Sequence, residues 1–171
     1  MPTAKLERRR YNNDSAIKAR FAEFAKEVVK SNADKEYALV VTTDNKCVTL
    51  RGNRGGVDIA KYGSPLKGAK VIHTHPDEDG FLGDCFSRED IESLIGHELK
   101  YLEVASGLGR YRVSYHGGNV TKSVDTIYAE AYAKGAELYD ENDVSADYPQ
   151  LRAMRSLSKI LKGIVFEEMK L

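Results

Sequence analysis

Two histidines and one aspartate in the middle of the sequence have the spacing of metal ligands. His73 and His75 occur in the run Val-Ile-His-Thr-His-Pro at residues 71–76, which predicts a short buried strand that ends at the proline. Because alternate residues of a strand point to the same side, both imidazoles face one way. Two converging imidazoles form half of a typical zinc site, since zinc accepts nitrogen ligands at about 2.0–2.1 Å. Asp90 is the favoured third ligand, because residues 87–95 predict a helix with Asp90 in its first turn.

The same residues also allow an interpretation without this site. Ser87 and Asp90 have the Ser-x-x-Asp spacing of a helix cap ahead of an apolar run, and a single histidine is more often a core or surface residue than a ligand. Capping alone does not require two histidines in alternate strand positions, so the joint pattern favours a metal site in which Ser87 both caps the helix and serves the site. Asp84 is a rival third ligand, but it lies in a polar loop with no helix to hold it.

This pattern resembles the motif of the JAMM, or MPN+ (JAB-type), zinc metalloproteases. The matching residues are His-x-His-Pro at 73–76 and Ser-x-x-Asp at 87–90, and the resemblance covers roughly residues 17–115. In that family two histidines and one aspartate hold zinc, a serine lies beside the zinc-bound water, and a glutamate base precedes the first strand of the sheet. Glu36 matches this glutamate, because it stands directly before the apolar run Tyr37–Val41.

The chain departs from the family pattern between the second histidine and the aspartate. Fourteen residues separate His75 from Asp90 (90 − 75 − 1), several more than the family usually has. Phe86 stands where the family often has a proline before the serine. The additional residues predict a longer loop beside the metal, at residues 77–86.

The resemblance implies a hydrolase that cleaves an isopeptide or peptide bond next to a ubiquitin-like or small carrier protein. Zn²⁺ in such a site lowers the pKa of a water molecule toward about 7. Glu36 would take up the water proton and return it to the leaving amine, and Ser87 would donate a hydrogen bond to the developing oxyanion. Two alternatives come from other classes of protein: a non-catalytic MPN-type scaffold with a structural metal, and a RadC-like protein associated with DNA repair.

Apolar spacing and turn residues predict the elements that position these side chains. They indicate an α/β fold with a mixed β-sheet flanked by helices, and the resemblance implies the JAB/MPN-like, cytidine-deaminase-like arrangement of layers. The expected helices span residues 15–30, 87–95, 120–138 and 149–169, and the first is capped by Asp14 or Ser15. The expected strands span residues 37–41, 47–50, 71–76, 101–105 and 111–115, while residues 57–62 form a short strand or a helix. By resemblance, the glycine-rich loop at residues 51–56 borders the substrate groove.

The chain is expected to divide into three parts. Residues 1–13 read as a flexible N-terminal tail, residues 14–118 as the metalloprotease domain, and residues 119–171 as a helical extension packed on the same domain. The last expected helix has an apolar face that suits packing on the core, and a homodimer through that face stays open.

Composition is typical of a globular protein. Of the 171 residues, 42% are hydrophobic and 30% are charged, and 26 Lys plus Arg balance 26 Asp plus Glu. The chain therefore has no net positive charge that would attract nucleic acid or an anionic membrane. Its expected partner is a protein or peptide substrate. No apolar run approaches the roughly 18 residues of a spanning helix, and no apolar signal core is found, which predicts a cytoplasmic protein. Cys47 and Cys85 are expected as free thiols, and no Cys-x-x-Cys pair supports a nucleophile or ligand role for Cys85.

Overall fold

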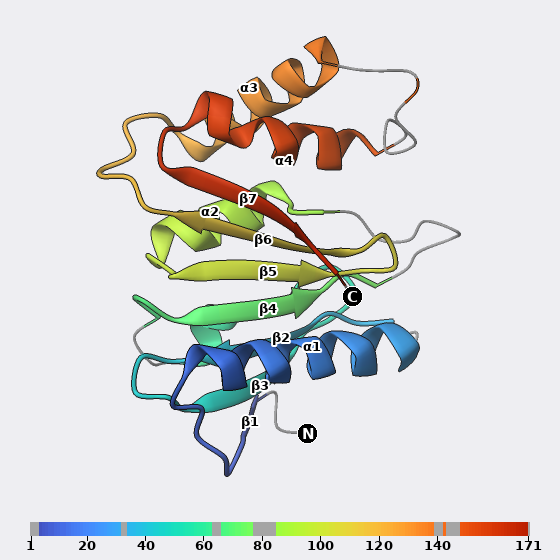
Figure 1. Cartoon of the computed structure of the whole chain (residues 1–171), viewed down its shortest axis with the longest axis vertical. Coiled ribbons are helices and arrows are strands. Elements are labelled where there is room, and N and C mark those ends of the chain that lie inside the picture. Colours follow the sequence, from blue (N-terminus) through green and yellow to red (C-terminus); the bar gives the residue numbers. More distant parts are fainter. Residues whose placement is uncertain are drawn as a thin grey trace.

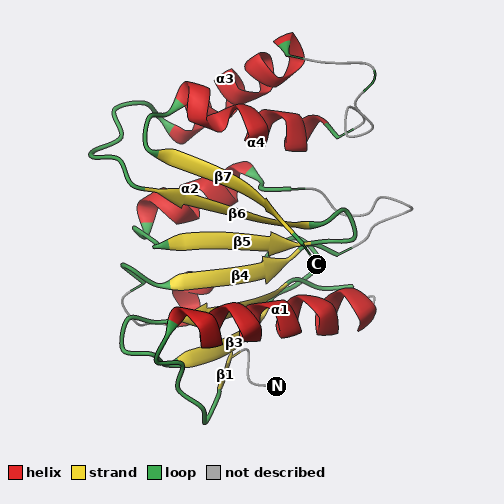
Figure 2. Ribbon diagram, in the orientation of Figure 1, coloured by secondary structure: helices red, strands yellow, loops and turns green. Residues whose placement is uncertain are grey.

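The computed structural model describes residues 4–31, 34–62, 66–76, 85–138, 142 and 148–170. Within these ranges, seven strands form one mixed sheet in the order β1-β3-β2-β4-β5-β6-β7, with helices on both faces (Figures 1 and 2). The strands are β1 (Ala4–Leu6), β2 (Tyr37–Val41), β3 (Cys47–Arg51), β4 (Lys70–Thr74), β5 (Tyr101–Ala105), β6 (Arg110–Tyr115) and β7 (Ile164–Met169). The helices are α1 (Asp14–Ser31), the 3₁₀ turn η1 (Ile59–Tyr62), α2 (Arg88–Gly96), α3 (Val124–Glu137) and α4 (Pro149–Ile160).

Strand β4 lies at the centre of the sheet and carries the first histidine. It pairs antiparallel with β2 and parallel with β5, and the segment between β4 and β5 contains α2. A parallel pair needs such a crossover, which explains why a helix follows the histidine strand. Both faces of β4 are covered, so the strand is buried along nearly its whole length.

Two apolar cores pack against the two faces of the sheet. One core lies under α1 and contains Ile72, and the other lies under α2, α3 and α4 and contains Val71. Since side chains alternate along a strand, His73 shares the face of Val71 and points to the side of α2. Figure 1 shows α1 and α2 on opposite faces.

Most of the predicted elements in residues 15–115 are confirmed. The strands at 37–41, 47–50, 101–105 and 111–115 and the helix at 87–95 are present within one or two residues of their expected bounds, and the open choice at residues 57–62 is resolved as the turn η1. The predicted cap of the first helix was wrong by one residue. Asn13 fills it, because its Oδ1 accepts the Ala16 N–H at 2.8 Å.

The expectation of a flexible tail was wrong for residues 4–13. Strand β1 pairs antiparallel with β3, and the backbone N–H of Glu7 continues this contact to the carbonyl of Cys47 at 2.8 Å. Tyr11 is buried, with only 4% of its surface exposed, and its hydroxyl donates to Glu7 at 2.8 Å. The strand is three residues long and exposed, so it has too little apolar alternation to reveal itself in the sequence.

The expectation of a purely helical C-terminal segment was also wrong. The predicted helix at 149–169 ends at Ile160, and β7 then joins the sheet antiparallel to β6. Gly163 separates the two with a φ of +92°, a conformation that favours glycine, and β-branched and aromatic residues follow it. The helix expected from residue 120 begins at Val124, where Ser123 accepts the Thr126 N–H at 3.1 Å.

No helix of the described chain is long and apolar enough to cross a membrane. Residues 77–84, which include Asp84 and most of the predicted longer loop, lie outside the described part of the chain.

Candidate metal centre

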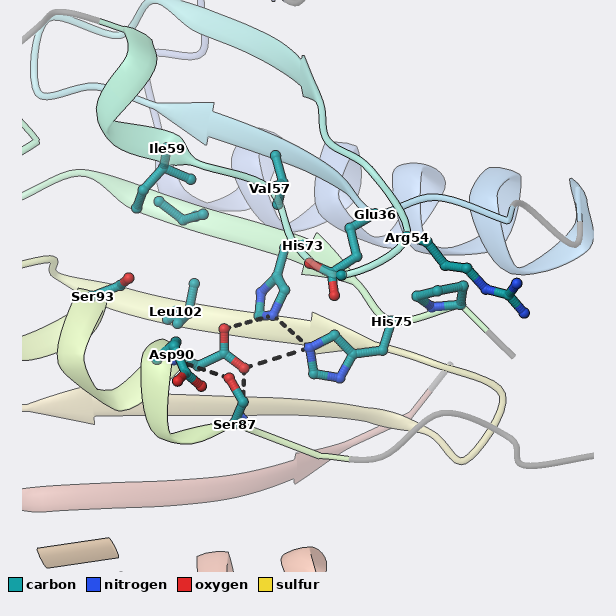
Figure 3. Close-up of a pocket in the computed structure, with 15 residues that line it drawn as sticks. Glu36, Arg54, Val57, Ile59, His73, His75, Ser87, Asp90, Ser93 and Leu102 are labelled. Atoms are coloured by element: carbon teal, nitrogen blue, oxygen red, sulfur yellow. Dashed lines mark hydrogen bonds and ion pairs between the residues drawn. The ribbon is translucent and has the colours of Figure 1, made fainter. Parts of the chain in front are cut away.

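His73, His75 and Asp90 converge in the structure. His73 comes from β4, His75 follows the end of that strand, and Asp90 lies in the first turn of α2 (Figure 3). Nε2 of His73 lies 3.1 Å from Nε2 of His75 and 3.0 Å from Oδ1 of Asp90. Nε2 of His75 lies 3.5 Å from Oδ2 of Asp90. Within the described residues, these three form the group whose ligand atoms are close enough to hold a metal ion.

The spacing of these atoms fits a tetrahedral ion. With metal–ligand bonds of about 2.0–2.1 Å, two ligands of a tetrahedron are about 3.3 Å apart. The separation of 3.1 Å between the two nitrogens is close to that edge length, and the Asp90 carboxylate reaches the nitrogens through different oxygens, Oδ1 at 3.0 Å from His73 and Oδ2 at 3.5 Å from His75. The donor set of two imidazole nitrogens and one carboxylate is also one that zinc accepts. The residues present therefore fit a metal of this kind.

The orientation of His73 is set by the neighbouring strand. Its Nδ1 lies 2.8 Å from the backbone carbonyl oxygen of Glu103 on β5. A carbonyl oxygen only accepts hydrogen bonds, so Nδ1 carries the hydrogen and a neutral ring presents the lone pair of Nε2 to the centre. Metal-binding histidines are commonly held by such a bond from the other ring nitrogen. The residue is also almost fully buried, with only 3% of its surface exposed.

Asp90 caps its helix and faces the histidines at the same time. Its Oδ2 accepts the Ser87 N–H at 2.7 Å, and its own N–H donates to Ser87 Oγ at 3.2 Å, which is a reciprocal capping box. Burial raises the pKa of Asp90, but positive charge on His73 and His75, when these rings are protonated in the metal-free site, and their hydrogen bonds outweigh burial and hold that pKa below its ordinary value. Capping and metal binding are therefore compatible at this residue, because the two functions use the same carboxylate in one orientation.

Glu36 is held beside this group by the turn that follows β3. The backbone N–H of Glu36 donates to the carbonyl of Asn53 at 2.9 Å, and its carbonyl accepts the Gly52 N–H at 2.9 Å. Figure 3 shows the Glu36 carboxylate pointing toward His73. Burial raises the pKa of Glu36 above its ordinary value, against the lowering effects of the two histidines and a hydrogen bond from the Val57 N–H. A half-buried carboxylate with a raised pKa next to candidate metal ligands is suited to proton transfer.

Gly52 allows this turn to close over Glu36. A Cβ at Gly52 would lie 2.8 Å from Cα of Val57 and would also collide with the carbonyl oxygen of Gly56. Only a residue without a side chain permits this approach, so the glycine-rich loop at 51–56 helps to orient Glu36.

A cavity of about 440 Å³ opens onto the centre. Ser87 lines it together with the three ligands and Glu36, so the structure brings all five predicted site residues together. The bond from Asp90 uses a lone pair of Ser87 Oγ, which leaves the hydroxyl hydrogen to donate elsewhere. The remaining lining residues are Arg54, Gly55, Gly56, Val57, Ile59, Val71, Pro76, Glu89, Ser93 and Leu102.

Some of these features were not predicted from the sequence. The hydrogen bond from His73 to the backbone carbonyl of Glu103 could not be predicted from the sequence, because any residue type at position 103 supplies the same carbonyl group. The apolar residues Val57 and Ile59 directly follow the glycine-rich loop, and that adjacency was the available clue to the cavity wall. Cys85 packs in the apolar core beneath α2–α4.

No protein-family model, curated protein or solved structure matches the chain. The interpretation of this centre therefore depends on its own geometry. Its elements are three convergent side chains that could hold a metal ion, a half-buried carboxylate directed toward them, and a serine hydroxyl that lines the same cavity.

Proposed function

We propose that this protein is a zinc-dependent hydrolase that cleaves an isopeptide or peptide bond. The observation that carries the proposal is the convergence of the His73 and His75 Nε2 atoms, 3.1 Å apart, with the Asp90 carboxylate, whose oxygens lie 3.0 and 3.5 Å from them. The Glu36 carboxylate beside them supports hydrolysis over metal storage, because a resting metal site needs no base beside its ligands. We also propose that the sheet is of the JAB/MPN type, supported by the glutamate before β2, the histidines at the end of β4 and the helix that follows.

Each residue would contribute a separate part of the reaction. When bound, zinc supplies Lewis acidity, which polarises a carbonyl and lowers the pKa of a water molecule to about 7. Glu36 would accept the proton of the attacking water and deliver it to the departing amine. The Ser87 hydroxyl would donate a hydrogen bond to the carbonyl oxygen as negative charge develops on it. His73 and Asp90 would keep their orientations throughout, because Glu103 and the capping box hold them.

The proposed substrate is a protein or peptide, possessing an extended segment next to the bond that is cleaved. A ubiquitin-like or small carrier protein with an extended tail meets this requirement, and the pairing of such a tail with exposed backbone is a common mode of peptide recognition. The proposed site of action is the cytoplasm.

A metal-stabilised scaffold is the second candidate. It is favoured by one observation, that the ligands come from β4 and α2 and would tie the two elements together. In a scaffold of this kind Glu36 would have no role. Replacement of Glu36 therefore separates the two candidates.

The experiment uses zinc-loaded wild-type protein and two variants, Glu36→Gln and Glu89→Gln. Each is incubated with a library of proteome-derived peptides and with linear fusions of ubiquitin-like proteins, and new termini are counted by mass spectrometry. Glu36→Gln should bind zinc in the same ratio but lose cleavage by at least about 10²-fold. Glu89→Gln is the matched control, because Glu89 is exposed and lines the same cavity, and it should cleave at the wild-type rate. Wild-type turnover in Glu36→Gln would contradict the assignment of the base, and no turnover in the wild type would favour the scaffold.

A further inference from the structure

Arg54 contributes the one side chain with a permanent positive charge to the described lining of the cavity. The other charged lining residues, apart from the histidines, are the carboxylates of Glu36, Glu89 and Asp90. Figure 3 shows Arg54 on the side of His75, with its guanidinium group directed away from Glu36 and from the ligand group. One end of the cavity is therefore cationic.

A closed turn sets the position of Arg54. The Asn53 N–H donates to the Gly56 carbonyl at 3.0 Å, and Asn53 Oδ1 accepts the Gly55 N–H at 2.8 Å, so the turn closes on itself. The two backbone hydrogen bonds of Glu36, at 2.9 Å each, tie this turn to the proposed base. The backbone that carries Arg54 consequently keeps a fixed position relative to the metal centre.

The two residues after Arg54 leave the space beside it open. Gly55 and Gly56 also line the cavity but contribute only backbone atoms. Even a Cβ at Gly56 would meet no atom within 4 Å, and a Cβ at Gly55 would meet only Asn53 Oδ1, at 3.7 Å. A substrate can therefore approach the guanidinium group without displacing a side chain from either glycine.

The charge of Arg54 does not serve to adjust the proposed base. The main influences on the pKa of Glu36 are burial, the three candidate ligands and the Val57 N–H. Arg54 is not among them, which agrees with the direction of its guanidinium group in Figure 3. A role toward the substrate accounts better for its place in the cavity lining.

We infer that the Arg54 guanidinium group binds a carboxylate of the substrate and so selects substrates that carry one near the cleaved bond. The inference rests on the proposed hydrolytic function and adds the charged group that the site recognises. A guanidinium group presents parallel N–H donors that match the two oxygens of a carboxylate, and such charge-assisted pairs are stronger than neutral hydrogen bonds. The carboxylate can belong to an acidic side chain or to a C-terminus, since both offer the same group.

The expected selectivity is modest, because Arg54 is exposed to water. An ion pair in contact with water gains less free energy than a buried one. We therefore expect a carboxylate compound to bind about 3- to 10-fold more tightly than the amide of the same shape.

The first test measures binding separately from turnover. Three compounds of nearly equal size are titrated by NMR: N-acetyl-glutaminamide has no carboxylate, N-acetyl-glutamate α-amide has one on its side chain, and N-acetyl-glutamine has one at its C-terminus. The proteins are wild type, Arg54→Gln and the control Arg51→Gln, each with and without zinc. Arg51 is also exposed and lies at the end of β3, but it is not among the described residues that line the cavity.

At least one carboxylate compound should bind the wild type and Arg51→Gln more tightly than the neutral compound. The ratio of the two affinities should be about 3- to 10-fold lower in Arg54→Gln, and the compound that loses affinity identifies the source of the carboxylate. Binding of a carboxylate to zinc itself contributes equally in all three proteins. Equal affinity of the wild type for the three compounds, no binding of any of them, or the same ratio in Arg54→Gln as in Arg51→Gln would overturn the inference.

Cleavage of the peptide library supplies the second test. Wild type and Arg51→Gln should favour bonds close to an acidic residue or to the C-terminus, and Arg54→Gln should lower kcat/KM for these substrates by about 3- to 10-fold while neutral substrates are unaffected. Arg54→Lys should keep part of the preference, because it retains the charge but loses the paired donors. Cleavage without a carboxylate preference would contradict the inference and leave the hydrolase proposal intact. Carboxylate binding that depends on Arg54, without any cleavage, would contradict the hydrolase and keep Arg54 as a carboxylate-binding residue.

Discussion

Nε2 of His73 lies 3.0 Å from Oδ1 of Asp90, which brings the central strand of the sheet into contact with the first turn of α2. The hydrogen on His73 Nδ1 is committed to the carbonyl of Glu103, so a neutral ring directs a lone pair at the carboxylate. Two electron pairs at this distance repel unless a cation lies between them. The contact therefore requires either a proton on the ring or a metal ion, and Nε2 of His75 lies 3.1 Å away as a further possible ligand.

Ser87→Ala should affect both stability and activity. The change removes the cap of α2, which is expected to cost about 0.5–2 kcal/mol of unfolding free energy, and it removes the proposed oxyanion donor, which is expected to lower kcat by about 10²–10³-fold. Ser123→Ala is the matched control, because Ser123 caps α3 in the same way outside the metal centre. Urea unfolding and peptide cleavage should show similar losses of stability but a loss of rate in Ser87→Ala alone. Equal rates in the two variants would reduce Ser87 to a capping residue.

Gly52→Ala should disturb Glu36 without removing the metal. The added Cβ collides with the backbone at Gly56 and Val57, so the turn must open and the pairing of Glu36 with Gly52 should weaken. We expect cleavage to fall by at least about 10-fold while the zinc content of the folded protein is unchanged. Gly118→Ala is the control, because a Cβ there meets no atom within 4 Å. Unchanged cleavage in Gly52→Ala would mean that the turn does not position the base.

Glu103→Gln should destabilise the fold but spare the centre. In the buried Glu103 carboxylate, Oε2 lies 2.7 Å from Nη2 of Arg110 and Oε1 lies 2.6 Å from Nη2 of Arg112. The change therefore leaves the positive charges of the two guanidinium groups without a neighbouring negative charge. Breaking a buried ion pair in this way typically costs about 3–5 kcal/mol. Glu168→Gln breaks the more exposed pair with Arg155 and should cost no more than about 1 kcal/mol in the same urea titration. Because His73 contacts the backbone of Glu103 and not its side chain, folded Glu103→Gln should still bind zinc.

The N-terminal segment should make stability depend on alkaline pH. Burial and the hydrogen bond to Glu7 raise the pKa of Tyr11 from 10.0 to about 12. The folded state thus favours the neutral phenol, so this contribution is complete below pH 10 and is lost as the pH rises from 10 toward 12. Tyr11→Phe removes the titrating group. Urea unfolding followed by circular dichroism between pH 9 and 12 should show a smaller loss of unfolding free energy with rising pH in the variant than in the wild type. If the unfolding free energies of the two proteins fall equally with pH, Tyr11 does not cause the alkaline loss of stability.

The sequence predicted the elements of the site well because its local signals agree with the fold. The short apolar run before His73 and a capping pattern at Ser87 each define an element, and the parallel pairing of β4 with β5 makes the helix between them return to the strand end. The position of Glu36 depended on a resemblance, and the structure adds the turn that orients it. Long-range pairing is what the sequence did not reveal. Strand β1 is too short to show a pattern, and the residues after Gly163 fit a helical spacing although they extend the sheet as β7.

The most direct test of the account is the metal content of the purified protein, measured by elemental analysis for wild type, His75→Ala, Asp90→Ala and the control His97→Ala. His97 follows α2 and is not one of the grouped ligands, so its replacement should leave binding intact. The wild type and His97→Ala should each hold about one zinc per chain, and the other two variants should lose it. Absence of metal from the wild type after incubation with zinc, or full zinc retention in Asp90→Ala, would contradict the account.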